Sequence, residues 1–147
     1  MRVLKRGITL LCGCTLLLGA GAIPAWGDTV VVVSKRSTIT RLSETEAKAI
    51  FLGKMTRLPG GSEIQVLLQD SGTAAHAEFL EKLVARTDAQ FKSLWARRVF
   101  TGAVSPPLQL PDNRAVVDHV ARLPGSIGYI STDTVNDSVR VVYTVKK

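Results

Sequence analysis

The chain has 147 residues, of which 46% are hydrophobic and 21% are charged, and its formal net charge is +7. Without a leader of 27 residues, 120 residues remain, with 16 basic and 12 acidic side chains and a net charge of +4. This length predicts one domain with one core. The modest positive charge fits small anions or an anionic membrane surface, or serves solubility alone, and it argues against nucleic-acid binding.

The first 27 residues have the pattern of a secretory signal peptide, with three basic residues, an apolar run and small residues at positions 25 and 27. We therefore expect cleavage after Gly27, a mature domain over residues 28–147 and a periplasmic location. A lipoprotein signal that ends at Cys14 is the alternative. Cys12 and Cys14 are the two cysteines of the chain, so the predicted mature domain has no disulfide and no cysteine nucleophile.

Residues 29–35, TVVVVSK, are the first predicted strand. A continuous β-branched run suits a strand that is covered on both faces in a parallel sheet, so this strand is expected to be central. Lys35 and Arg36 follow near its carboxyl end, where open α/β sheets bind ligands. They are candidate accessory cations for an anion, and a solvated loop is the alternative.

A helix and a second strand follow. Ser43 and Glu46 have the spacing of a capping box, and Gly53 marks the end of the helix. Residues 63–69, EIQVLLQ, predict the second strand. Strand, helix and strand make a βαβ unit, for which parallel pairing and a right-handed crossover are the default.

The second strand leads into a helix through Asp70, Ser71, Gly72 and Thr73. The first amide groups of a helix lack intrahelical partners and carry the positive end of its dipole, and Ser or Thr hydroxyls beside them add donors. Ser71, Gly72 and Thr73 therefore form a candidate anion site. The alternative is that these residues only cap the helix and make the turn.

Two further helices and two strands complete the chain. Thr87 and Gln90 form another capping box, and Trp95 lies on the apolar face of that helix. A helix over residues 112–123 and strands over residues 126–131 and 138–145 follow, the last strand toward an edge. The predicted fold class is α/β, with a mostly parallel sheet of about four strands flanked by about four helices.

The two histidines of the chain have no evident catalytic or metal partner in the sequence. His76 is expected to face solvent in the first turns of its helix, and His119 has no partner at metal-ligand spacing. No catalytic residue, metal site or cofactor is therefore predicted. Convergence of Ser71 with either histidine in space stays open at this point.

Four short blocks occur in an order that carries a resemblance: Ala49–Lys54 (AIFLGK), Asp70–Thr73 with Phe79 downstream, Phe100–Gly102, and Gly125–Tyr129. They resemble the phosphate-binding subunit of phosphate ABC transporters, in the type II periplasmic binding protein superfamily, whose ligand loop reads D-G-S-G-T-x-x-F. The resemblance implies a periplasmic-binding-protein-like fold, phosphate or another small oxyanion as ligand, and a membrane transporter or sensor as partner.

The sequence also departs from this family. Family members close two lobes around the anion, whereas 120 residues suffice for about one lobe. Leu67 stands where the family has an arginine that pairs with phosphate, so only Ser71, Gly72 and Thr73 carry over as ligand-binding positions, and Asp70 takes no role. We therefore expect weak binding, unless a partner, a face-to-face homodimer, or Lys35 and Arg36 cover the site.

Two functions compete on this sequence. The first is an exported oxyanion-binding module that acts in transport or sensing. The second is an interaction domain that docks on an envelope sensor or transport complex, with the anion loop vestigial. An enzyme is the weakest alternative.

Overall fold

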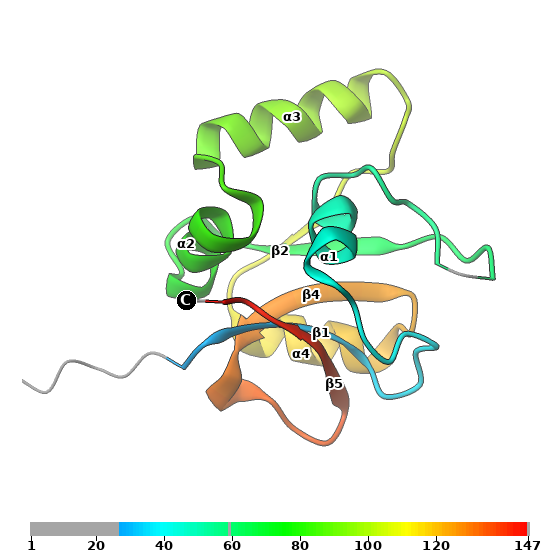
Figure 1. Cartoon of the computed structure of the whole chain (residues 1–147), viewed down its shortest axis with the longest axis vertical. Helices are drawn as coiled ribbons and strands as arrows, with labels where there is room; N and C mark the ends of the chain where they lie inside the picture. The colour runs from blue at the N-terminus through cyan, green and yellow to red at the C-terminus, as the bar shows by residue number, and fades with distance from the viewer. Residues whose placement is uncertain (1–26, 59, 147) are drawn as a thin grey trace, which may run out of the picture.

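The computed structural model describes residues 27–58 and 60–146, so the predicted signal peptide up to residue 26 lies outside the described residues. The elements, in chain order, are β1 (Thr29–Ser34), α1 (Glu44–Phe51), β2 (Gln65–Gln69), α2 (Ala74–Glu78), the π-helical segment η1 (Phe79–Val84), α3 (Asp88–Phe100), β3 (Leu108–Leu110), α4 (Asn113–Arg122), β4 (Ser126–Ser131), the short 3-10 segment η2 (Thr132–Thr134) and β5 (Val139–Thr144). Figure 1 shows their arrangement.

The strands form one sheet in the order β3-β2-β4-β1-β5. β2 pairs in parallel with β3 and with β4, whereas β1 pairs antiparallel with both β4 and β5. Four strands therefore point in one direction and β1 points against them, which confirms the predicted mixed α/β fold with a mostly parallel sheet. β3 is an additional short strand in the connection that follows Pro106 and Pro107. β5 lies at an edge, as predicted.

The prediction that β1 and β2 pair in parallel as a βαβ unit is wrong. β4 lies between them, and β1 runs antiparallel to it. Residues 30–33 are at most 1% exposed, so the β-branched run correctly indicated a strand buried on both faces. A β-branched run indicates burial but not strand direction. The expectation that two strands joined by a helix pair in parallel therefore did not hold for β1 and β2.

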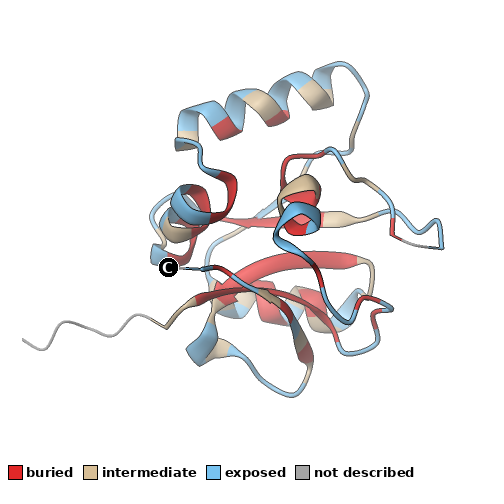
Figure 2. Ribbon diagram, in the orientation of Figure 1, coloured by how far each residue is buried: buried red, intermediate tan, exposed pale blue. Residues whose placement is uncertain are grey.

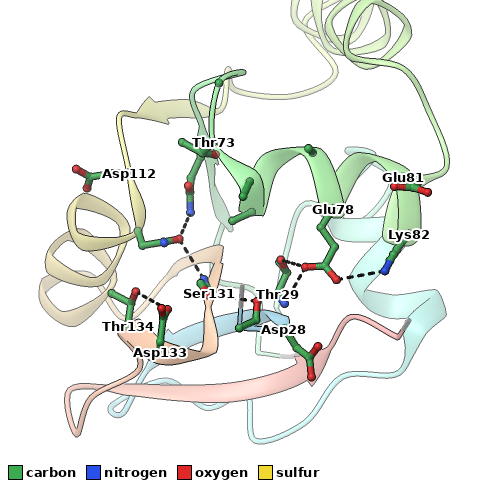
Figure 3. Close-up of a pocket in the computed structure, with 17 residues that line it drawn as sticks. Asp28, Thr29, Thr73, Glu78, Glu81, Lys82, Asp112, Ser131, Asp133 and Thr134 are labelled. Atoms are coloured by element: carbon green, nitrogen blue, oxygen red, sulfur yellow. Dashed lines mark hydrogen bonds and ion pairs between the residues drawn. The ribbon is translucent and has the colours of Figure 1, made fainter. Parts of the chain in front are cut away.

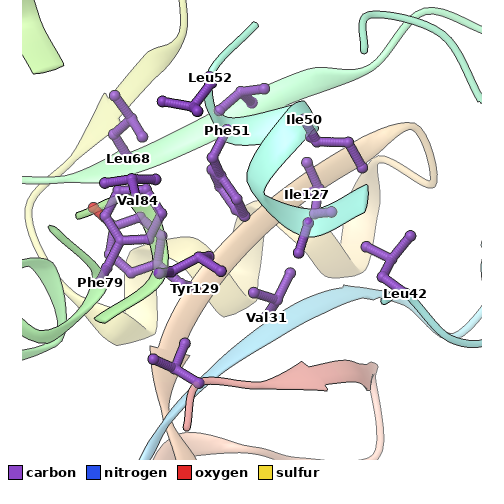
Figure 4. Packing of buried hydrophobic residues seen from close by; sticks show 14 of the residues in the cluster. Val31, Leu42, Ile50, Phe51, Leu52, Leu68, Phe79, Val84, Ile127 and Tyr129 are labelled. Atoms are coloured by element: carbon purple, nitrogen blue, oxygen red, sulfur yellow. The ribbon is translucent and has the colours of Figure 1, made fainter. Parts of the chain in front are cut away.

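The central strands of the sheet are buried (Figure 2), and apolar side chains cover both of its faces. On one face, α4 packs through Val116, Val117 and Val120 against residues that include Val30 and Leu67. The larger cluster on the other face joins the sheet to α1, η1 and α3. Figure 4 shows its centre, and its aromatic members are Phe51, Phe79, Phe91, Trp95 and Tyr129.

The predicted helix starts are confirmed by their caps. Ser43 with Glu46, and Thr87 with Gln90, form complete capping boxes at α1 and α3. The helix after Thr73 differs from an ordinary α-helix, because it widens at Phe79 into the π-helical segment η1. Its four apolar residues Ala75, Phe79, Leu80 and Leu83 are buried as predicted.

Candidate functional site

The predicted anion loop lies at the edge of the sheet where β2 ends and α2 begins. Thr73 is the N-cap of α2: its Oγ1 accepts a hydrogen bond from the His76 backbone N–H at 3.2 Å and donates one to the Asp70 carbonyl oxygen at 3.2 Å. A side chain added at Gly72 would meet no atom within 4 Å, so the backbone there is open to a ligand. The capping role is therefore real, and it leaves the loop backbone accessible.

Ser71 lies beside an ion pair at the start of α3. Its Oγ donates to Asp88 Oδ2 at 3.0 Å and accepts from Lys92 Nζ at 3.1 Å, while Lys92 Nζ and Asp88 Oδ2 are 2.7 Å apart. The Lys92 side chain is 60% exposed. This cation was not among the predicted site residues, although its spacing of four residues from Asp88 on one helix indicates an ion pair.

The prediction that His76 faces solvent is wrong, since the residue is only 4% exposed. Its Nδ1 lies 2.6 Å from the Tyr129 hydroxyl, and its Nε2 lies 2.9 Å from Asp88 Oδ1. The Tyr129 oxygen already accepts the Gln69 backbone N–H at 2.9 Å, so the hydroxyl proton is directed to Nδ1. The neutral imidazole then carries its own proton on Nε2 and donates it to Asp88.

The electrostatics of this network follow from its contacts. The hydrogen bond from Lys92, followed by that from His76, lowers the pKa of Asp88 from its ordinary value of 3.8 to about 2. Burial raises the pKa of Tyr129 above that of an exposed tyrosine, which keeps its hydroxyl protonated as a donor. Asp88 therefore stays ionised and Tyr129 stays neutral over the physiological pH range.

Ser71 and His76 come together only through Asp88. In a nucleophilic triad the serine hydroxyl is bound to the imidazole, whereas here the Ser71 hydroxyl donates to the carboxylate. Both imidazole nitrogens are occupied, one by Tyr129 and the other by Asp88. The geometry is that of a structural network that fixes the loop to the core and to α3.

The candidate accessory cations lie elsewhere. Because β1 runs against β4, its carboxyl end lies at the opposite edge of the sheet from the loop. Arg36 there donates through Nη2 to the carbonyl oxygens of Ala121 and Arg122 at the end of α4, at 3.3 and 3.1 Å. The structure therefore does not bring Lys35 and Arg36 to Ser71, Gly72 and Thr73.

Leu67, where the resemblance implies an arginine, is fully buried in the cluster beneath α4. A β-carbon added at Gly128 would lie 3.3 Å from the Leu67 Cβ and 2.7 Å from Val116 Cγ1. Leu67 therefore supplies no charge to the loop, whereas Lys92 contacts it through Ser71 Oγ.

A cavity of about 650 Å³ opens beside the loop (Figure 3). Gly72, Thr73 and the first turn of α2 form one wall, and the start of α4 forms another. Its charged lining consists of Asp28, Glu78, Glu81, Asp112, Asp133 and Lys82. The side chains of this lining, five carboxylates and one ammonium, have a formal charge of −4, to which the predicted cleavage after Gly27 would add the α-ammonium of Asp28. The cavity was not predicted, because these residues come from five separate segments.

Two other observations bear on the kind of site. Over residues 27–58 and 60–146, no three His, Cys, Asp or Glu side chains group closely enough to hold a metal ion. Within the same described residues, no helix has the length and apolar character needed to cross a membrane.

Solved structures with a similar fold include proteins described as phosphate transport proteins. A putative phosphate ABC transporter substrate-binding protein with bound phosphate, from Clostridium perfringens, is 21% identical with a TM-score of 0.64, over 80% of this chain and 44% of that protein. An ABC-type phosphate transport receptor from Vibrio cholerae is 16% identical with a TM-score of 0.59, over 80% of this chain and 46% of the receptor. PstS from Borrelia burgdorferi is 15% identical with a TM-score of 0.60, over 80% of this chain and 47% of PstS.

The chain thus spans less than half the length of these proteins. No family model matches the sequence, and no curated protein matches it. The structural likeness confirms the predicted fold resemblance to phosphate ABC transporter substrate-binding proteins.

Proposed function

We propose that this chain is an exported, non-catalytic binding module that takes a small oxyanion, such as phosphate, at the start of α2 and acts in transport or sensing. The observation that carries the proposal is the juxtaposition of the open loop Ser71-Gly72-Thr73 with the ammonium of Lys92, 3.1 Å from Ser71 Oγ. Proteins of the same fold are phosphate transport receptors, and one of them holds phosphate.

The proposed ligand would bind to groups that already have partners. Ser71 would turn its hydroxyl proton from Asp88 to the anion, and Lys92 would share its charge between the anion and Asp88. The amides of the loop add the positive end of the helix dipole, about 0.3 to 1 kcal/mol for an exposed site. Asp88 stays ionised and repels the anion.

These terms predict weak binding, with a dissociation constant of roughly 1 mM or above. Tight sites bury about 70 to 90% of a small ligand, and an open loop on one face of a single domain cannot do this. A second surface, from a transporter, a sensor or another copy of this chain, would raise the affinity by covering the anion. The proposed location is the periplasm, where such partners lie in the envelope.

Calorimetric titration tests this proposal with phosphate, sulfate and a sugar acid. Phosphate or sulfate is expected to give heat at millimolar concentration, and the double variant Ser71→Ala, Thr73→Val is expected to abolish it. Lys92→Gln should weaken binding about five-fold or more, because it removes the charge that touches the loop. Lys54→Gln removes another exposed lysine, outside the loop, and should change little.

The absence of heat with both phosphate and sulfate up to roughly 10 mM would contradict the proposal, and so would heat that is the same in the Ser71 and Thr73 variants. The double variant loses the N-cap Thr73, which costs about 1 kcal/mol of stability, so circular dichroism should establish that it is folded.

A docking domain is the second candidate, and the end of α3 favours it. Phe100 is 92% exposed beside Arg97 and Arg98, an apolar and basic surface suited to a partner. Gentle extraction from the envelope should then recover the protein in a complex, and Phe100→Ser should release it. Recovery of a lone monomer under the same conditions would count against docking.

A further inference from the structure

The outer face of α3 carries exposed arginine side chains without partners. Arg86 lies just before the helix and Arg97 in its last turn, and both are exposed. Among the described residues, neither guanidinium group has a hydrogen-bond or ion-pair partner. Arg98 lies beside Arg97 and is half-buried, and its Nη1 donates to the Gly53 carbonyl oxygen at 3.2 Å. Each of these arginines stays positively charged at any physiological pH.

The same three arginines line a shallow groove of about 520 Å³ along α3. Of the described residues in its lining, the arginines alone are charged, so the groove has a formal charge of +3. Guanidinium groups bind phosphate oxygens through two parallel N–H bonds. The groove is therefore complementary to phosphate esters.

Phe100 is the last residue of α3, and 92% of its surface is exposed. Ala89, Ser93 and Ala96 precede it at intervals of three or four residues, so these four residues share one face of the helix. All four are exposed. Because the three preceding side chains are small, a flat surface can approach the helix closely between the arginines and the phenyl ring.

α3 is the outermost element on its side of the molecule (Figure 1), and most of its surface is exposed (Figure 2). Its 13 residues extend over about 20 Å. A lipid bilayer matches both chemistries of this face, since headgroup phosphates pair with arginine and the interfacial region takes up aromatic rings. A symmetric dimer through this face would instead place Arg86 and Arg97 against the arginines of the second copy, and like charges repel.

We propose that α3 docks the protein on an anionic lipid bilayer. The three arginines bind headgroup phosphates, and Phe100 inserts at the boundary between headgroups and acyl chains. The inference rests on the docking function proposed for this surface, and it names the partner. The oxyanion loop is not involved, because residues 71–73 lie outside the groove.

Co-sedimentation of the exported chain, purified from the periplasm, with lipid vesicles tests the inference. We expect binding to vesicles of phosphatidylcholine and phosphatidylglycerol in a ratio of about three to one, and at least about ten-fold weaker binding to phosphatidylcholine alone. Salt at about 0.5 M should weaken binding to the anionic vesicles about ten-fold, because it shortens the distance over which charges interact.

Arg97→Gln should weaken binding to the anionic vesicles about five-fold, and Phe100→Ser about ten-fold. The matched controls lie on α4, which covers the opposite face of the sheet. Arg114→Gln removes an exposed arginine there, and Leu123→Ser removes an exposed apolar side chain at the end of the helix. Each control should change binding less than about two-fold.

Fluorescence of the variant Phe100→Trp reports insertion directly. Its emission should shift to shorter wavelength when anionic vesicles are added, because the indole leaves water. The emission of the parent chain should stay unchanged, since Trp95 is buried.

The inference is overturned if the chain does not bind anionic vesicles, if it binds neutral vesicles equally well, if the α4 controls weaken binding as much as the α3 variants, or if Phe100→Trp shows no shift. A protein complex that Phe100→Ser releases, from a chain that does not bind vesicles, would overturn the lipid partner and leave the docking function intact. Ser71→Ala should leave vesicle binding unchanged, so the oxyanion proposal is tested separately.

Discussion

Asp88 joins the anion loop, α2 and α3, because its carboxylate accepts hydrogen bonds from Ser71, His76 and Lys92. From His76 the series continues through the Tyr129 hydroxyl to the backbone N–H of Gln69 on β2. Each hydrogen bond in this series then has a defined donor: the Gln69 N–H donates to the Tyr129 oxygen, the Tyr129 hydroxyl to His76 Nδ1, and His76 Nε2 to Asp88. The loop is therefore held by polar contacts on one side and by the sheet on the other.

Asp88→Asn is expected to destabilise the protein by about 1 kcal/mol at pH 7. The loss is this small because the ion pair of Asp88 with Lys92 is partly exposed to solvent, which screens it. The folded pKa is about 2 and the ordinary value is 3.8, so the stability from this carboxyl is complete above pH 4 and is lost as the pH falls through 2. Urea unfolding at pH 7 and pH 3 measures both effects.

Asp118→Asn, at an exposed position of α4, is the control for Asp88→Asn. It should leave stability within about 0.5 kcal/mol of the parent at pH 7. Equal effects of the two substitutions would show that the Asp88 contacts do not stabilise the fold.

Tyr129→Phe should destabilise the protein by about 1 to 3 kcal/mol, because it leaves the Gln69 N–H and His76 Nδ1 without their buried partner. Packing is unaffected, since the phenyl ring can keep its stacking on Phe79, with ring centroids 4.1 Å apart. Thermal unfolding measures the loss. Tyr143→Phe on the edge strand β5 is the control, and a similar loss there would contradict the assignment.

At the scale of elements, the helix after the loop departs from regular α-helical geometry where α2 continues into the π-helical segment η1. This segment ends at Ala85, which has a left-handed backbone with φ 50°, and the Ala85 N–H donates to the Leu80 carbonyl oxygen. A left-handed residue with a β-carbon is unfavourable, and glycine is the usual residue there. The sequence signalled the start of this helix through Thr73, but it has no glycine to mark its end.

Ala85→Gly should therefore raise the free energy of unfolding by about 0.5 to 1 kcal/mol, because it relieves the left-handed strain. Ala96→Gly, in the exposed middle of α3, should lower it by about 1 kcal/mol. Chemical denaturation of both variants gives the comparison. A loss of stability in Ala85→Gly would mean that the backbone at this position is not strained.

At the scale of the whole molecule, the sequence indicated the elements and the loop well, since caps and apolar spacing are local signals. Ser43 with Glu46, and Thr87 with Gln90, needed no tertiary information. The direction of β1 depends on which strands become its neighbours, and this does not follow from its own residues. Lys35 and Arg36 were candidates for the site because β1 was expected to point toward it.

The acidic cavity and the buried position of His76 were missed for a related reason. The cavity collects side chains from the segment before β1, α2, η1, the start of α4 and η2, and only the folded sheet brings them together. The position of His76 in the first turns of its helix indicated a solvent-facing side chain. In the fold its imidazole instead contacts the hydroxyl of Tyr129 from β4. The loop itself was found because its residues are contiguous.

The central claim is that the loop before α2 binds a small oxyanion, and an NMR titration of the ¹⁵N-labelled chain with phosphate tests it most directly. We expect saturable shifts of the Ser71, Gly72 and Thr73 amides with a dissociation constant of roughly 1 mM or above, and a dissociation constant that is about five-fold or more higher in Lys92→Gln. Shifts that are absent at these three amides, or that persist unchanged in Lys92→Gln, would contradict it.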